Sequence, residues 1–199
     1  MAEGLVRVVA WVPRGTEARL GELVQAERAR RRLMVAEDPR WDTSGRTADE
    51  RAAVKLARVA WLADLRGRGE LLDTSAAVLA LGVRGELAAR GWDHEWPPAP
   101  ETAVSGRWWG SRAEGFPERV AANLPVALVD QVRAACWHSS PIAELRAWRD
   151  RRPGPLRGAL RAEYDQLAAG VKVPGEIWRG AYRRVLGWPS THAAEDAQG

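Results

Sequence analysis

Two short β-branched runs, each ended by a proline, constrain the fold more than any other feature of this 199-residue chain. The first covers residues 5–12 and stops at Pro13, and the second covers residues 118–124 and stops at Pro125. Proline cannot donate to a strand ladder, and the segments outside these runs show helical rather than alternating periodicity. The sequence therefore predicts a mainly α protein with one or two short β-strands.

The two runs also share a pattern. Arg, Val, Ala and Pro occur at the same four offsets in residues 7–13 and in residues 119–125, and a helix is predicted after each run. If this is an internal repeat, the two strands can pair within one chain and form an intrachain pseudo-dimer. Chance recurrence in a chain rich in Ala, Val and Arg is the alternative, and a homodimer then supplies the second strand.

Capping signals and apolar periodicity predict helices in both parts of the chain. Thr47 and Glu50 form a capping box, Asp73-Thr74 is a second N-terminal signal, and Ser140-Pro141 is a third. The expected helices cover about 16–33, 47–65, 74–90, 126–138, 141–152, 156–167 and 174–186.

A segment rich in Gly, Pro, Trp and Ser divides the sequence at residues 91–117. Its Trp96-Pro97-Pro98-Ala99-Pro100 stretch cannot be helical, because proline removes backbone donors. We expect a linker here, between an N-terminal part (1–90) and a strand–helix–helix unit with two basic helices (118–188). A polar tail, 189–199, is expected to be disordered. Most of the eleven tryptophans are expected in the core, and the Trp108-Trp109 pair is expected to be exposed.

The charge balance is basic, at +4 with a pI near 9.9. Of the thirty basic residues 28 are arginine, a skew typical of high-GC bacterial genomes. The excess is local, because residues 141–186 hold ten basic and five acidic side chains. This region suits an anionic partner, with a solvated helical surface as the alternative.

Composition also limits the class of protein. Without an apolar run of about 20 residues or a signal pattern, we expect no membrane association and a cytoplasmic location. One cysteine cannot form an internal disulfide, and with three histidines it argues against a structural zinc site. We expect no cofactor and no enzymatic activity, since phosphate-binding and nucleophile motifs are missing from the sequence. Cys136 lies on an apolar stripe and is expected to be an inert buried thiol, not a partner of His138.

Residues 119–133 read as an alternating strand, a Pro, two residues, two aliphatics, Asp, a spacer, Val and Arg. This pattern resembles the Arc/MetJ-type family of ribbon–helix–helix DNA-binding proteins over residues 118–152, less than a fifth of the chain. The resemblance implies an antiparallel ribbon lying in the major groove of double-stranded DNA. Carried over by position, it implies base contacts from Arg119, Ala121 and Asn123.

The resemblance further implies that Ser139 and Ser140, at the start of the second helix, present backbone N–H groups to a phosphate. The sequence departs from the family in two respects, since Ala121 cannot hydrogen-bond a base and the turn over residues 137–140 is short and lacks glycine. Separately, Arg179, Arg183 and Arg184 share a helix and are predicted to contact phosphates.

These observations favour a DNA-binding regulator or accessory factor, with carriage on a plasmid or phage left open. The alternative is a helical protein-interaction or structural module that does not read DNA.

Overall fold

The computed structural model describes residues 4–101 and 116–187. It is mostly helical with one two-stranded antiparallel sheet, as the sequence predicts, and both strands lie where they were expected. The elements in chain order are β1 (Leu5–Val12), α1 (Thr16–Glu37), the 3-10 turn η1 (Pro39–Trp41), α2 (Ala48–Gly67), α3 (Ser75–Ala89), β2 (Glu118–Pro125), α5 (Val126–His138), α6 (Ile142–Asp150), α7 (Gly158–Ala168) and α8 (Pro174–Leu186).

β1 and β2 pair with each other, so the chain supplies both strands of its ribbon. The register runs from Leu5 opposite Pro125 to Val12 opposite Glu118. Alternate side chains form a buried inner face, because successive residues of a strand point to opposite sides. The buried residues are Val8, Ala10, Val12, Val120, Ala122 and Leu124. This is the intrachain pairing that the repeated motif allows.

The repeat continues from the strands into the helices that follow them. At the same shift of 112 residues, each buried position of α1 has a buried counterpart in α5. The equivalent pairs are Thr16 and Leu128, Leu20 and Val132, and Val24 and Cys136. The burial pattern therefore supports an internal repeat over chance recurrence.

Helices α3 and α8 are a second pair of counterparts, related by a shift of 99 residues. The buried equivalents are Val78 and Ile177, Leu79 and Trp178, Gly82 and Ala181, and Val83 and Tyr182. The two helices pack on each other, and the contacts with the ribbon are crossed: α3 packs on β2 and α8 on β1. At the crossing, a Cβ on Gly82 would lie 2.3 Å from the carbonyl oxygen of Ala181, so only glycine permits this approach.

Each half thus consists of a strand, a helix, an inserted helical arm and a second helix. Equivalent residues meet at two places: Val9 pairs with Ala121 in the ribbon, and Gly82 contacts Ala181 between α3 and α8. Contacts between equivalent positions are the signature of a two-fold axis. The chain is a pseudo-symmetric dimer built from one polypeptide.

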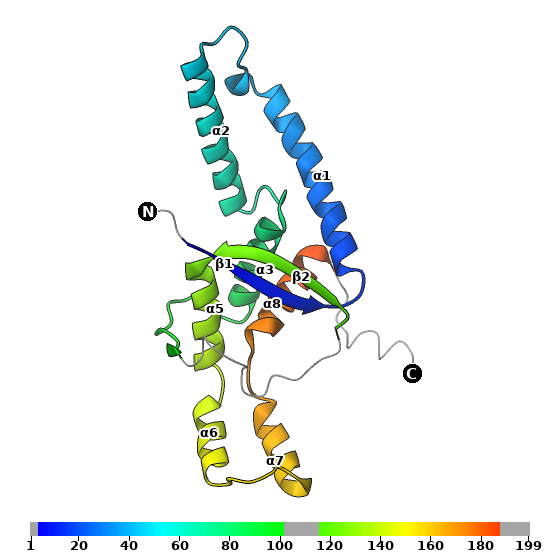
Figure 1. Ribbon diagram of the computed structural model, residues 1–199, viewed down its shortest axis with the longest axis vertical. Coiled ribbons are helices and arrows are strands. Elements are labelled where there is room, and N and C mark those ends of the chain that lie inside the picture. Colours follow the sequence, from blue (N-terminus) through cyan, green and yellow to red (C-terminus); the bar gives the residue numbers. More distant parts are fainter. Residues whose placement is uncertain (1–3, 102–115, 188–199) are drawn as a thin grey trace.

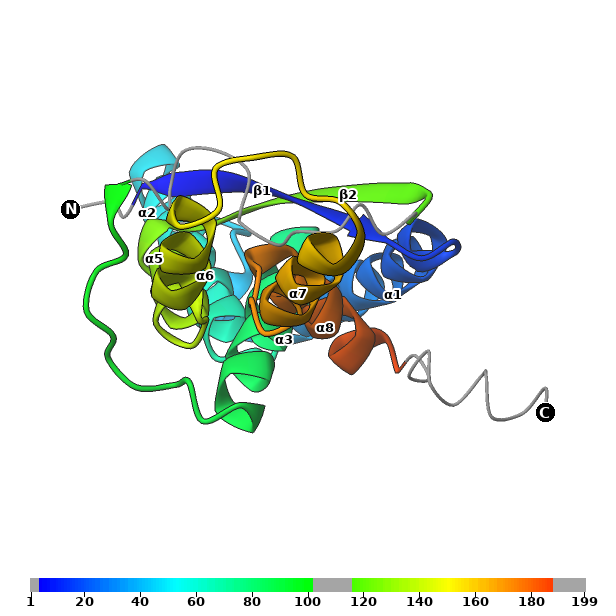
Figure 2. The same ribbon diagram turned by 90° about the horizontal axis from the view of Figure 1, so that it is seen from below.

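One hydrophobic core serves both halves. It combines β1, α1 and α3 with β2, α5 and α8, so the 91–117 segment does not separate two cores. In Figure 2 the ribbon forms one side of the molecule, with α3 and α8 beneath it.

Two arms project from this core in opposite directions (Figure 1). The first contains the distal part of α1, η1 and α2, and the second contains α6 and α7. The rings of Trp41 and Trp61 lie 5.1 Å apart in the first arm. The second arm has a small core of its own, formed by Leu145, Ala168 and Val171.

Charged residues fix the base of the first arm. The buried carboxylate of Asp73 accepts hydrogen bonds from Arg66 (2.6 and 2.8 Å) and Arg31 (2.7 Å). Burial by itself would raise the pKa of Asp73, but Arg66 and then Arg31 hold this pKa below its usual value. The next residue, Thr74, caps α3 by accepting from the backbone N–H of Ala77.

The capping predictions had different outcomes. The Thr47–Glu50 capping box is present at the start of α2 and is confirmed. The Ser140-Pro141 signal was wrong in detail, because α6 begins at Ile142 with Pro141 at its cap and no side-chain cap. Trp108, Trp109 and the 189–199 tail lie outside the described residues. Within the described ranges, every helix is too short or too polar to span a membrane.

Candidate functional site

The outer face of the ribbon is the surface that the pseudo-symmetry places on the axis of the molecule. Its central pair, Val9 and Ala121, is half-buried. Arg7 pairs with Asn123 on one side of the centre, and Trp11 pairs with Arg119 on the other. These four side chains are exposed, and 53% of the Trp11 surface is accessible.

The arginines of this face are not neutralised. Neither Arg7 nor Arg119 forms an ion pair among the residues that the structure describes. A guanidinium that is held on a strand and free of a carboxylate keeps all its donors for a ligand. The outer face of the ribbon therefore presents two cations, one amide and one indole, together with the exposed Leu5 and the half-buried Val9–Ala121 pair.

The end of the ribbon carries an acidic residue whose role is internal. The Glu118 carboxylate accepts from the backbone N–H groups of Glu17 (3.0 Å) and Gly15, at the start of α1. These donors, Glu17 first, hold the pKa of Glu118 below its usual value. The N-terminus of α1 is occupied by this carboxylate and is not open to an anion.

The sequence-predicted base contacts come together as expected, since Arg119, Ala121 and Asn123 all lie on the outer face of β2. The predicted phosphate contacts do not join them. Ser139 ends α5, and the hydroxyl of Ser140 donates to the Cys136 carbonyl (2.5 Å) and accepts from the Lys172 backbone N–H (2.8 Å). These bonds tie the end of α5 to the segment that leads into α8.

The three arginines of α8 lie on the other side of the ribbon from its outer face. Arg184 pairs with Glu86 of α3 at 3.2 Å, and the Arg179 guanidinium lies over the Phe116 ring at 4.7 Å. Arg183 is half-buried on the same helix. α8 packs against the inner face of the ribbon (Figure 2), so these arginines and the outer face do not form one surface.

Sequence reasoning missed half of the outer face. Arg7 and Trp11 were not assigned as site residues, because the family pattern was carried only onto the second strand. The signal was the recurrence of Arg, Val, Ala and Pro, which makes Arg7 equivalent to Arg119 and Trp11 equivalent to Asn123.

Cys136 is fully buried, in agreement with the expected inert thiol. Burial, with the charge of Glu176, raises its pKa to about 12. The thiolate is the nucleophilic form, and it is not populated near neutral pH. Among the described residues, no three ligating side chains are grouped to hold a metal ion.

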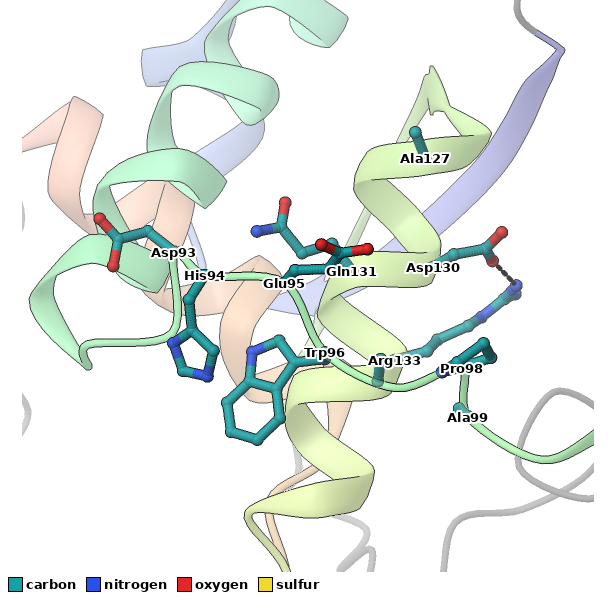
Figure 3. A pocket seen from close by; sticks show the side chains of 11 residues that line it. Asp93, His94, Glu95, Trp96, Pro98, Ala99, Ala127, Asp130, Gln131 and Arg133 are labelled. Atoms are coloured by element: carbon teal, nitrogen blue, oxygen red, sulfur yellow. Dashed lines mark hydrogen bonds and ion pairs between the residues drawn. The ribbon is translucent and has the colours of Figure 1, made fainter.

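A pocket of about 640 Å³ lies between α5 and the segment after α3 (Figure 3). Carboxylates dominate its charge, because Asp93, Glu95 and Asp130 line it while Arg133 pairs with Asp130 at 3.3 Å. Trp96, which lines the pocket, stacks on His138 with the centroids of the two rings 6.0 Å apart. The acidic lining makes this pocket unsuitable for a phosphate backbone.

The chain was compared with protein families, curated proteins and solved structures, and none of the three comparisons finds a match.

Proposed function

We propose that this protein binds double-stranded DNA through the outer face of its ribbon, in the manner of a ribbon–helix–helix protein. The observation that carries the proposal is a two-stranded antiparallel ribbon with a buried inner face and an outer face on which Arg7, Arg119 and Asn123 are exposed. The major groove of B-DNA has the width to admit such a ribbon. The groove is about 12 Å wide, which is enough for two strands but too narrow for a larger sheet.

The chemistry of the outer face suits base edges. Arginine can donate two hydrogen bonds to O6 and N7 of guanine, and asparagine can pair with N6 and N7 of adenine. Arg7, Arg119 and Asn123 supply both functions, and the small central pair Val9–Ala121 permits close approach of the ribbon to the base pairs. The proposal does not use the α8 arginines, whose contacts with Glu86 and Phe116 favour a structural role.

Selection of binding sites from random duplex DNA, followed by titration of the selected duplex, tests this function. Arg119→Ala and Asn123→Ala are each expected to cost about 1–3 kcal/mol for the selected site and to leave non-specific binding nearly intact. Arg32→Ala is the matched control, since Arg32 is an exposed arginine of α1, remote from the ribbon. Equal losses on all duplexes would make these residues phosphate contacts, and no loss would exclude the ribbon as the interface.

The salt dependence of binding provides a second measurement. A DNA complex releases counterions, so the logarithm of affinity should fall linearly with that of salt concentration, with a slope near 0.9 per phosphate contact. Neutralising Arg179, Arg183 and Arg184 together should leave this slope unchanged if their role is structural. A decrease of about two to three units in the slope would show that these arginines contact phosphates, as the sequence predicted.

One observation favours the alternative of a protein-interaction module. Helices α1 and α2 of the first arm expose three large aliphatic side chains, Leu33 (61%), Leu56 (72%) and Val59 (54%). Exposed apolar groups of this kind can mark a protein-binding surface. Failure to bind any duplex at low salt would leave this function as the better one.

A further inference from the structure

We propose that the ribbon reads a non-palindromic DNA site, because its two halves carry different side chains at equivalent positions of the reading face, above all Trp11 in one half and Asn123 in the other. The inference rests on the proposed function and adds the symmetry of the target to it. Dimers of identical chains present the same residues twice and so match palindromic sites. A dimer made from one chain is free of that constraint.

The register fixes which residues are equivalent about the axis. Val9 and Ala121 pair with each other and are also related by the 112-residue shift, so the axis passes through this central pair. Two positions away on either side, the same shift relates Arg7 to Arg119. These arginines lie symmetrically about the centre and are suited to two guanines placed symmetrically in the site.

The exposed position beside each arginine breaks the symmetry. Trp11 and Asn123 are related by the same shift, and each lies opposite one of the arginines, Trp11 beside Arg119 and Asn123 beside Arg7. An asparagine amide donates to N7 and accepts from N6 of adenine. An indole has a single donor and no acceptor, and its apolar edge suits the thymine methyl group.

Trp11 and Asn123 therefore make the two half-sites differ in the base that is read beside each guanine. The Arg7–Asn123 half favours a guanine with a nearby adenine, whereas the Arg119–Trp11 half favours a guanine with a nearby thymine methyl. Trp11 is 53% exposed and lies outside the shared core. The core therefore does not require a tryptophan at position 11, and the residue at this position can affect which base is preferred.

Symmetrising substitutions test this inference. Trp11→Asn makes both halves Arg–Asn, and Asn123→Trp makes both halves Arg–Trp. Selection from random duplexes should give a non-palindromic consensus for the parent and a palindromic consensus for each variant. We expect Trp11→Asn to prefer its palindrome over the parental site by roughly 5- to 150-fold, the range for one bidentate base contact. Leu56→Asn, an exposed apolar-to-asparagine change on α2, is the control and should keep the parental consensus.

The possible outcomes distinguish a failure of this inference from a failure of the proposed DNA binding. A palindromic consensus for the parent would overturn the inference and leave DNA binding intact. A non-palindromic consensus that Trp11→Asn does not change would also overturn it, provided that circular dichroism shows a folded variant. Without an enriched sequence and salt-dependent binding, the proposed function itself fails.

Discussion

The shared core and the first arm are stabilised in different ways. In the core, α3 and α8 approach so closely that a side chain at Gly82 has no room, and apolar residues from six elements pack together. In the first arm, α2 buries only Val54 and Leu65, and hydrogen bonds from arginines to Asp73 fix the base. The shared core is held by close apolar packing, whereas the base of the first arm is held by hydrogen bonds to one buried carboxylate.

Gly82→Leu tests the packing of the core, and it should have the largest effect on the free energy of unfolding. The new Cβ would lie 2.3 Å from a backbone oxygen of α8, so the two helices must separate. We expect a loss of about 3 kcal/mol or more in the free energy of unfolding, measured by urea titration. Gly21→Ala on α1 is the control, because nothing lies within 4 Å of its Cβ position, and it should be neutral or stabilising. A Gly82→Leu variant with parental stability would contradict the observed crossing.

Asp73→Asn should affect the base of the first arm. The amide keeps the shape but leaves Arg66 and Arg31 without a counter-charge, at a cost of about 1–3 kcal/mol because both guanidinium groups are partly solvated. Hydrogen exchange should show the loss first in α2 and the distal part of α1. Uniform loss over α3 and α8 as well would show that the arm and core unfold together.

The same variant has a defined pH dependence. The folded pKa of Asp73 is lowered, so its stabilising contribution is complete above the unfolded pKa, near 4, and is lost as pH falls through the folded value. The difference in stability between parent and Asp73→Asn should therefore be constant at neutral pH and shrink in acid. A difference that instead grows as pH falls toward 4 would show that the folded pKa is raised.

Tyr182→Phe should increase stability. The Tyr182 hydroxyl is buried without a hydrogen-bond partner among the described residues, and burial raises its pKa. Removing an unsatisfied donor while keeping the ring should gain about 1 kcal/mol. Thermal unfolding of the two proteins measures this. A clear loss would mean that the hydroxyl has a partner, such as an internal water.

Thr47→Ala should have the smallest effect, at the tip of the first arm. The hydroxyl caps α2 by accepting from the Glu50 backbone N–H at 3.3 Å, and its loss should cost about 1 kcal/mol of local helix stability. Thr47→Ser retains the cap and is the control. The proposed DNA binding by the ribbon should be the same in both variants, and reduced binding by Thr47→Ala alone would show that the arm contributes to it.

The strands and the α2 cap were predictable because local residues decide them. The pairing of β1 with β2 was also accessible, since Arg7 and Arg119 begin the same short pattern. The correspondence of α3 with α8 was not, because arms of unequal length change the shift from 112 to 99 and the paired residues differ in kind, as Val83 and Tyr182 do.

In the candidate site, too, features set by local residues could be predicted, and contacts between distant residues could not. Alternation along a strand placed Arg119 and Asn123 on one face, and the structure agrees. The helical spacing of Arg179 and Arg183 could not reveal that Glu86 and Phe116 meet the arginines of this helix, because those residues come from distant parts of the chain.

The single-chain ribbon also determines when the protein can fold. Every residue of β1 pairs with a residue more than 100 positions further along the chain. During synthesis, β1 must leave the ribosome with its apolar face and its strand edge uncovered until β2 and α8 have been made. Contacts of such long separation form slowly, and no local element can replace them. Assembly of this ribbon is independent of protein concentration, unlike that of a homodimer, and depends instead on synthesis of the chain through α8.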